Sequence, residues 1–248
     1  MTKRTSIGVG VAAIAIGAGI VVPALAQVED LPETDISTDI EVSSTKAGTP
    51  KHPKGVSITV KATLTTEPDV DPPIVTGVEN LFGPGAFWNG ADYVKCSKRV
   101  LDTKGPKGCP RESIMGAGIA TAKADTVDTK LTLTLINGGA RRLLAYATLT
   151  NPARVQETIV VKATNATGKW RHRESFRIPK SLQVVAGIPI EVTSLRFTLG
   201  GKPYAKNFIT TTSCPKGGWR YHNTVHYLYD LTGQTATDTF GGSVSCTS

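Results

Sequence analysis

The sequence predicts an all-β protein, an antiparallel two-sheet sandwich of about ten or eleven strands with two disulfides. Three observations predict it: apolar and polar residues alternate with a period of two, turn-forming residues separate the alternating runs, and the chain has 4 cysteines. The 248 residues include 25 Gly and 15 Pro, and 19% are charged. This composition is too rich in turn formers for a helical bundle, and its 40% hydrophobic content is too high for a disordered chain.

Residues 1–26 are expected to be a secretory signal peptide that is cleaved after Ala26. Lys3 and Arg4 supply the positive start, residues 7–22 are uncharged, and Ala24-Leu25-Ala26 is a small-x-small cleavage site. An uncleaved membrane anchor is the alternative, but the uncharged run is shorter than the roughly 20 residues that span a bilayer. We therefore expect a secreted or extracellular protein.

Residues 27–54 are predicted to form a flexible acidic linker ahead of a basic domain, residues 55–248. The linker segment has six acidic residues against three lysines, a net charge of −3, whereas residues 55–248 carry +9. It is rich in Thr, Ser, Pro and Gly and has no sustained period, so it lacks the apolar surface that would offset the entropy of ordering it.

The alternation of the domain begins with Val56, Ile58 and Val60, whose side chains are separated by polar ones. Turn signals such as Asn137-Gly138-Gly139 and Gly200-Gly201 separate this run from similar ones. Only residues 96–104 are expected to form a short helical turn. Strands are predicted at residues 56–65, 74–82, 115–123, 129–136, 142–150, 156–164, 169–178, 190–199, 204–212, 219–229 and 235–245.

The four cysteines of an exported chain indicate disulfides. Three pairings are formally allowed, and we favour Cys96 with Cys109 and Cys214 with Cys246. In the chain-entropy model, loops of these lengths stabilise the fold by roughly 3–4 kcal/mol each. A zinc site is the alternative, but no Cys-x-x-Cys pair occurs.

A search for catalytic and metal-binding motifs names no catalytic residue, no metal ligand and no cofactor. His222 and His226 have the spacing of zinc-binding histidines on a helix, but their segment alternates as a strand, where residues i and i+4 lie about 13 Å apart. The Gly116-Ala117-Gly118 run leads into a strand rather than a helix, so it predicts a bulge or a close backbone approach. Glycosidase chemistry would need two nearby carboxylates, and the sequence does not pair any of the candidates, Glu157, Glu174, Glu191 and Asp92.

Two basic segments are the candidate binding residues, because clustered positive charge attracts anionic polymers. Aromatic residues beside the first segment, Phe87, Trp88 and Tyr93, suggest a sugar-stacking platform, with burial in the core as the alternative for Trp88. A solvated surface that confers solubility is the alternative for both segments. The named binding candidates are Lys95, Lys98, Arg99, Lys107 and Arg111 in the first segment, Lys169, Arg171, Arg173 and Arg177 in the second, and Trp88.

A set of glycines, cysteines and prolines resembles a group of uncharacterised secreted proteins of high-GC Gram-positive bacteria. The resemblance spans most of residues 55–246 and implies an exported β-rich fold with two local disulfides. It carries no established catalytic or binding residue. The resembling positions are Leu81-Phe82-Gly83-Pro84-Gly85, Asn89-Gly90, Cys96, Gly105, Cys109-Pro110, Ser113, Gly116-Ala117-Gly118, Ala120, Cys214-Pro215 and Gly218-Trp219.

Two functions follow as hypotheses. The first is a non-catalytic protein of the cell envelope or extracellular space that binds anionic wall polymers, glycans or a membrane surface through its basic segments. Nucleic acid is not an expected partner after export. The second is a secreted carbohydrate-active enzyme or lectin-like module that uses Trp88 or Trp219. The missing catalytic motifs favour the first, and the oligomeric state stays open.

Overall fold

Ten of the eleven predicted strands join one large antiparallel sheet in the computed structural model of the chain. The structure describes residues 33–68, 70–229 and 233–248, which all belong to one compact unit, Pro32–Ser248. The predicted signal peptide lies outside the described residues. Within the described ranges, no helix combines the length and the apolar character needed to cross a membrane.

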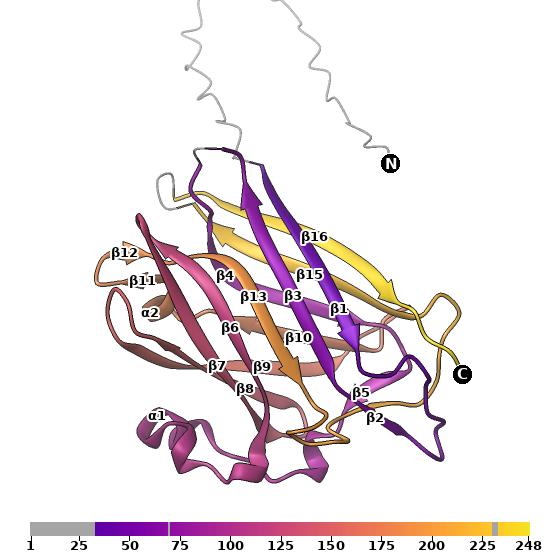
Figure 1. The fold of residues 1–248 in the computed structure, drawn as a ribbon. Coiled ribbons are helices and arrows are strands. Elements are labelled where there is room, and N and C mark those ends of the chain that lie inside the picture. Colours follow the sequence, from indigo (N-terminus) through magenta and orange to yellow (C-terminus); the bar gives the residue numbers. More distant parts are fainter. Residues whose placement is uncertain (1–32, 69, 230–232) are drawn as a thin grey trace, which may run out of the picture. The chain divides into compact units, whose positions relative to one another are not determined.

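The large sheet contains eleven strands in the order β1-β3-β13-β6-β7-β8-β9-β10-β4-β15-β16 (Figure 1). A three-stranded sheet, β2-β14-β5, and a two-stranded sheet, β11-β12, complete the strands described. The strands are β1 (Thr34–Val42), β2 (Lys54–Val56), β3 (Ile58–Thr66), β4 (Ile74–Phe82), β5 (Ala86–Trp88), β6 (Ile114–Ala124), β7 (Val127–Gly139), β8 (Arg142–Leu149), β9 (Val155–Asn165), β10 (His172–Arg177), β11 (Val184–Val185), β12 (Ile188–Pro189), β13 (Glu191–Leu199), β14 (Ile209–Thr211), β15 (Trp219–Leu228) and β16 (Thr235–Val244).

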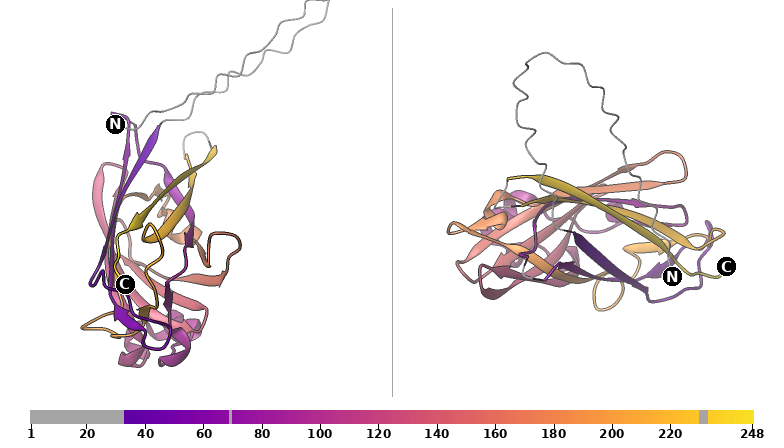
Figure 2. Two further views of the ribbon diagram at one scale, coloured as in Figure 1. Left: turned by 90° about the vertical axis from the view of Figure 1, so that its right-hand side faces the viewer. Right: turned by 90° about the horizontal axis from the view of Figure 1, so that it is seen from above.

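The strand order differs from the predicted sandwich of two sheets. The large sheet curls until its edge strands, β1 and β16, contact each other, so it is nearly closed on itself. Its first half, β1 to β7 in sheet order, lies in front of its second half, β8 to β16 (Figures 1 and 2). The two halves are joined by the hydrogen-bonded pair β7 and β8, in register from Leu131↔Leu149 to Gly139↔Arg142. Alternation places side chains inside or outside, but it does not reveal whether a sheet continues around a curve.

The described part of the predicted linker is ordered, which corrects that prediction. Residues 34–42 form β1, which pairs with β3 over nine residues, and Ala47 is buried. The inward-facing Ile36 and Ile40 pack toward the interior, while Asp39 and Glu41 face outward and both bind Lys61. The acidic outer side chains made this strand look like a polar tail in the sequence.

The interior between the two halves holds the main core. It includes Leu143, Ala147 and Leu149 of β8, together with Ile159 and Val161 of β9. Burying a Leu, Ile or Val side chain is worth roughly 1.5–3 kcal/mol, so this core stabilises the packing of the two halves against each other.

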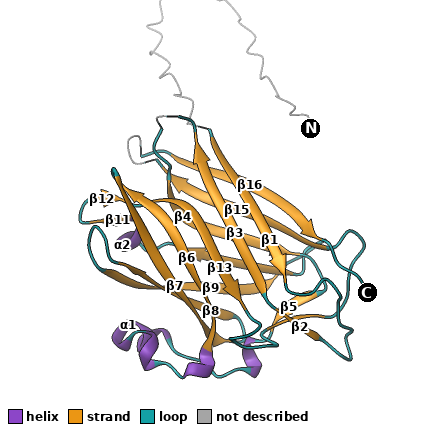
Figure 3. Ribbon diagram, in the orientation of Figure 1, coloured by secondary structure: helices purple, strands orange, loops and turns teal. Residues whose placement is uncertain are grey.

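A second core lies outside the sheet, beneath the helix α1 (Lys98–Lys104). Leu101 of α1 is fully buried with Ile136, Leu144 and Tyr146, which point outward from β7 and β8. Figure 3 shows α1 among short helical turns at one end of the molecule. The turns comprise Gly90–Asp92, Pro106–Gly108 and Arg111–Ser113, and a second short helix, α2 (Lys180–Gln183), lies elsewhere in the chain. The predicted helical turn at 96–104 is thus confirmed.

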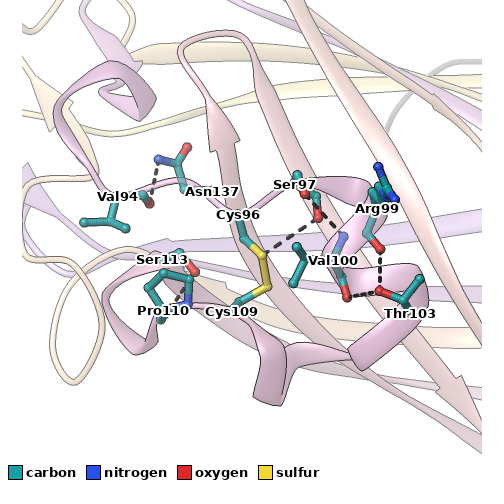
Figure 4. The surroundings of a disulfide bond; sticks show 10 residues. All are labelled: Val94, Cys96, Ser97, Arg99, Val100, Thr103, Cys109, Pro110, Ser113 and Asn137. Carbon is teal, nitrogen blue, oxygen red and sulfur yellow. Dashed lines mark hydrogen bonds between the residues drawn. A yellow bond between two sulfur atoms is a disulfide. The ribbon is translucent and has the colours of Figure 1, made fainter.

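Both favoured disulfide pairings are confirmed. Cys96 bonds to Cys109 with a Cα–Cα distance of 5.5 Å, and Cys214 bonds to Cys246 with a Cα–Cα distance of 5.6 Å. The first bond closes the loop that carries α1 (Figure 4), and the second ties the end of the chain to the segment before β15. Two disulfides indicate an oxidising, extracellular environment.

Candidate ligand-binding surface

The outer side of the second half of the sheet collects positive charge from five different positions. We call the outward-facing side of β8, β9, β10, β4 and β15 the basic face. These strands are consecutive in the sheet, so their outward side chains form one continuous surface. The only outward carboxylate described on these strands is Glu79, whose Oε1 lies 3.5 Å from Arg173 Nε. The exposed basic residues of this face are Arg142, Lys162, Arg173, Arg177 and Arg220.

The strand register defines how these residues lie. Arg142 is opposite Lys162, and Lys162 is opposite Ser175, which sits between Arg173 and Arg177 on β10. Neighbouring strands are about 4.8 Å apart, and alternate residues of one strand are about 6.7 Å apart. The basic side chains are therefore spaced within reach of one extended anionic chain.

The outer side of the first half has no such excess. Its outward-facing charges are balanced, and Lys61 is engaged by two carboxylates. Among the outward-facing strand residues, the excess of positive charge therefore lies on the basic face. The outward charges of this half that are not buried are Lys61, Lys123, Lys130 and Arg196 against Asp35, Asp39, Glu41 and Asp128, and the buried Glu191 lies opposite Lys123.

The first predicted basic segment lies next to the basic face. Its loop covers the outward-facing Leu144 of β8 and Val160 of β9. Arg142 lies two residues from Leu144 on β8, and Lys162 lies two residues from Val160 on β9. Lys95 and Lys98 of this loop line a shallow hollow of about 440 Å³ together with Arg142. Arg99, Lys107 and Arg111 are exposed on the same loop but do not line the hollow. Arg142 and Lys162 thus join the two predicted segments, which lie far apart in sequence.

The residues of the second predicted segment do not all lie on the same side of the sheet. Arg173 and Arg177 belong to the basic face, and Lys169 and Arg171 are exposed in the hairpin before β10. His172 and Glu174 have the opposite orientation and face the interior. Sequence reasoning missed Arg142, Lys162 and Arg220, because each is the only Lys or Arg of its strand, and Arg142 has only Arg141 beside it. Each of them occupies a position that the alternation of its strand places on the outer side, and this was the signal that could have found them.

Trp88 packs against the core and does not form an exposed platform. It lies on β5, partly buried against the main core, with its ring centroid 6.1 Å from that of Phe208. Tyr93 contacts the same Phe208 ring edge-on, and its hydroxyl accepts a hydrogen bond from the backbone N–H of Asn207. The core alternative for Trp88 is therefore the one observed.

A different tryptophan lies beside the basic face. Trp170 stacks on His222, with ring centroids 6.0 Å apart and an interplanar angle of 27°, and Lys169 Nζ lies 5.2 Å from the Trp170 ring centroid. His222 and His226 both lie on β15, on the side that also carries Arg220. In the ranges that the structure describes, no three His, Cys, Asp or Glu side chains are grouped closely enough to hold a metal ion.

The interior contains a polar row that crosses three strands. Glu174 is opposite Asn80, and Asn80 is opposite Asn223, which is buried. Burial raises the pKa of the Glu174 carboxyl to about 7, and its hydrogen bond with Asn80 opposes this only in part. Burial, with a smaller effect of the Arg171 charge, lowers the pKa of the neighbouring His172. Both side chains therefore favour their neutral forms, as a water-poor interior requires.

The raised pKa of Glu174 predicts a pH-dependent stability. The folded protein keeps this proton to a higher pH than the unfolded chain, so the free energy of unfolding falls as pH rises from about 4.5 to about 7. The free energy of unfolding should fall by about 2–3 kcal/mol over this range. One pKa unit corresponds to about 1.4 kcal/mol, and the partial exposure of the Glu174 side chain reduces the effect. Urea unfolding at pH 5 and pH 8 should show it in the wild type.

The variant Glu174→Gln should lose this part of the pH dependence, because its amide does not titrate. The matched control is Glu112→Gln, which removes an exposed carboxylate and should retain the wild-type difference. An identical pH dependence in Glu174→Gln and wild type would show that folding does not raise the pKa of Glu174.

Comparison with known proteins adds no relative. No family model, no curated protein and no solved structure matches the chain. The interpretation of this surface therefore rests on its geometry and charge.

Proposed function

We propose that the protein is a secreted, non-catalytic protein of the cell envelope or extracellular space that binds anionic wall polymers through its basic face. The observation that carries the proposal is the charge difference between the two outer sides of the sheet. Five basic residues and one carboxylate lie on the basic face, whereas the other side is balanced. Such an asymmetric surface attracts polyanions and orients them along one side.

The two disulfides and the resemblance to secreted proteins support an extracellular setting, in which wall glycans bearing phosphate or carboxylate groups are the available polyanions. The alternative, a lectin-like or carbohydrate-active protein that uses Trp88 or Trp219, has less support. Trp88 packs against Phe208, and Trp219 is buried with its Nε1 donating to the carbonyl of Ser213.

The proposal predicts weaker polymer binding when the basic face loses charge. The double variant Arg173→Gln/Arg177→Gln should bind immobilised polyphosphate and polygalacturonate about 2- to 30-fold more weakly at low salt, because each of the two exposed ion pairs contributes about 0.2–1 kcal/mol. Binding of the wild type should also fall as salt rises, since the Debye length shortens. Retention on both resins across a salt series measures the two effects.

The matched control is Lys123→Gln/Lys130→Gln, which removes the same charge from the opposite side of the sheet. It should retain near-wild-type binding. An equal loss in both double variants would indicate that only net charge matters, and salt-independent retention would contradict electrostatic binding altogether.

A further inference from the structure

A shallow, open hollow lies between the Cys96–Cys109 loop and the β7–β8 hairpin, beside the basic face. Its volume of about 440 Å³ is many times the ~30 Å³ that a water molecule occupies in the liquid. Three of its lining residues are cations, Lys95, Lys98 and Arg142, and none is acidic. The other lining residues are Cys96, Ser97, Val100, Gly108, Pro110 and Gly138.

The three cations are not equally available. Lys98 Nζ lies 2.6 Å from Asp102 Oδ2, four residues later on α1, so its charge is partly neutralised. In the described part of the chain, no carboxylate forms a salt bridge with Lys95 or Arg142. The hollow therefore retains about two uncompensated positive charges, enough to neutralise one doubly charged anion.

The loop that forms one wall is held rigidly against the hairpin that forms the other. The buried Asn137 side chain donates from its Nδ2 to the carbonyls of Gly90, Tyr93 and Val94 at 2.9, 3.0 and 3.1 Å, and the Cys96 N–H donates to the Asn137 carbonyl. These contacts fasten the backbone on both sides of Lys95, and Figure 4 shows the one between Asn137 and Val94.

The start of α1 and the disulfide complete this attachment. Ser97 caps α1 by accepting from the Val100 N–H, and Cys96 is tied to Cys109. Because Arg142 follows the same hairpin, the backbones that carry the two uncompensated cations are held in place before a ligand arrives. A preorganised site loses less entropy on binding than a mobile one.

We infer that this hollow is a specific site for a terminal phosphate group of the anionic polymer, and this inference rests on the proposed function. A terminal phosphate carries up to two charges, whereas a phosphate inside the polymer carries one, and it presents several acceptor oxygens, which suits one guanidinium fork and one ammonium. A single carboxylate has one charge and would leave the second cation uncompensated. Since Arg142 neighbours Lys162, a polymer with one phosphate in the hollow continues along the basic face.

The test compares the double variant Lys95→Gln/Arg142→Gln with Lys107→Gln/Arg111→Gln. The control pair removes the same charge, and both of its residues are exposed on the same loop outside the hollow. Binding to polyphosphate and to polygalacturonate is measured, followed by competition with inorganic phosphate against sodium chloride at equal ionic strength. Circular dichroism and thermal unfolding verify that both variants are folded.

We expect the wild type to prefer polyphosphate and to be displaced by inorganic phosphate more than by chloride. The hollow variant should lose at least tenfold in polyphosphate affinity together with the phosphate-specific competition, while the control changes less than threefold. Displacement by inorganic phosphate alone, with no preference for the polymer, would identify free phosphate as the ligand and overturn the polymer assignment.

Equal losses in the two variants, or no phosphate-specific competition in the wild type, would overturn the hollow as a site and leave the proposed function intact. Failure of the wild type to bind either polymer at low salt would instead refute the proposed function itself.

Discussion

Replacing Asn137 by alanine is expected to lower the free energy of unfolding by about 3–4 kcal/mol. The side chain is fully buried, its Nδ2 donates to three loop carbonyls, and its Oδ1 accepts from the Gly139 N–H. Each hydrogen bond contributes about 1 kcal/mol, and a buried partner left without a bond adds a penalty of about 1–3 kcal/mol. Urea unfolding measures the loss.

The same variant should weaken polyphosphate binding, because the backbone around Lys95 is no longer fastened to the hairpin. The control is Asn165→Ala, at an exposed position at the end of β9, which should change stability by less than about 0.5 kcal/mol. If Asn137→Ala is as stable as the wild type, the loop is held mainly by the disulfide.

Replacing Gly116 by alanine is expected to destabilise the fold by about 2–4 kcal/mol, in the range that overpacked core positions reach. A Cβ at Gly116 would lie 2.2 Å from the backbone oxygen of Thr198 on the adjacent β13, and a backbone atom in the middle of a sheet has little room to move. Thermal or urea unfolding should reveal the change.

The control is Gly83→Ala, because the nearest atoms to a Cβ at Gly83 are at 3.5 Å, an ordinary contact. Its stability should stay within about 0.5 kcal/mol of the wild type. If Gly116→Ala were equally mild, β6 and β13 would have to separate readily, and the close approach would not be a requirement of the fold.

The close approach at Gly116 illustrates what sequence reasoning predicts well. Glycine within an alternating run indicates a bulge or a close neighbour, and both are present, since the β6–β7 register shifts between Ile114 and Gly116. Ten of the eleven predicted strands and both disulfides were predicted correctly for a related reason, whereas the predicted strand 204–212 is a strand only at Ile209–Thr211. Alternation, turns and short disulfide loops are local features, and they are readable in a single stretch of chain.

Prediction failed where neighbours in the fold come from distant parts of the chain. The strand β1 was taken for a linker because its hydrophobic partners are supplied by β3 and by the interior, not by its own composition. Trp88 was considered for an exposed platform because its packing partner Phe208 is 120 residues away. The candidate residues Arg173 and Arg177 were found as a cluster, whereas Arg142 and Lys162 were not.

The sequence by itself determined most of the long strands and which side chains of each of them share a side, because a pleated strand has a strict two-residue period. Only the tertiary structure decided which strands lie next to one another, that their sheet curls almost closed, and that Lys95, Arg142, Lys162 and Arg173 occupy adjoining positions. Strand order is set by the burial of the whole interior, a sum over distant contacts that no local pattern contains.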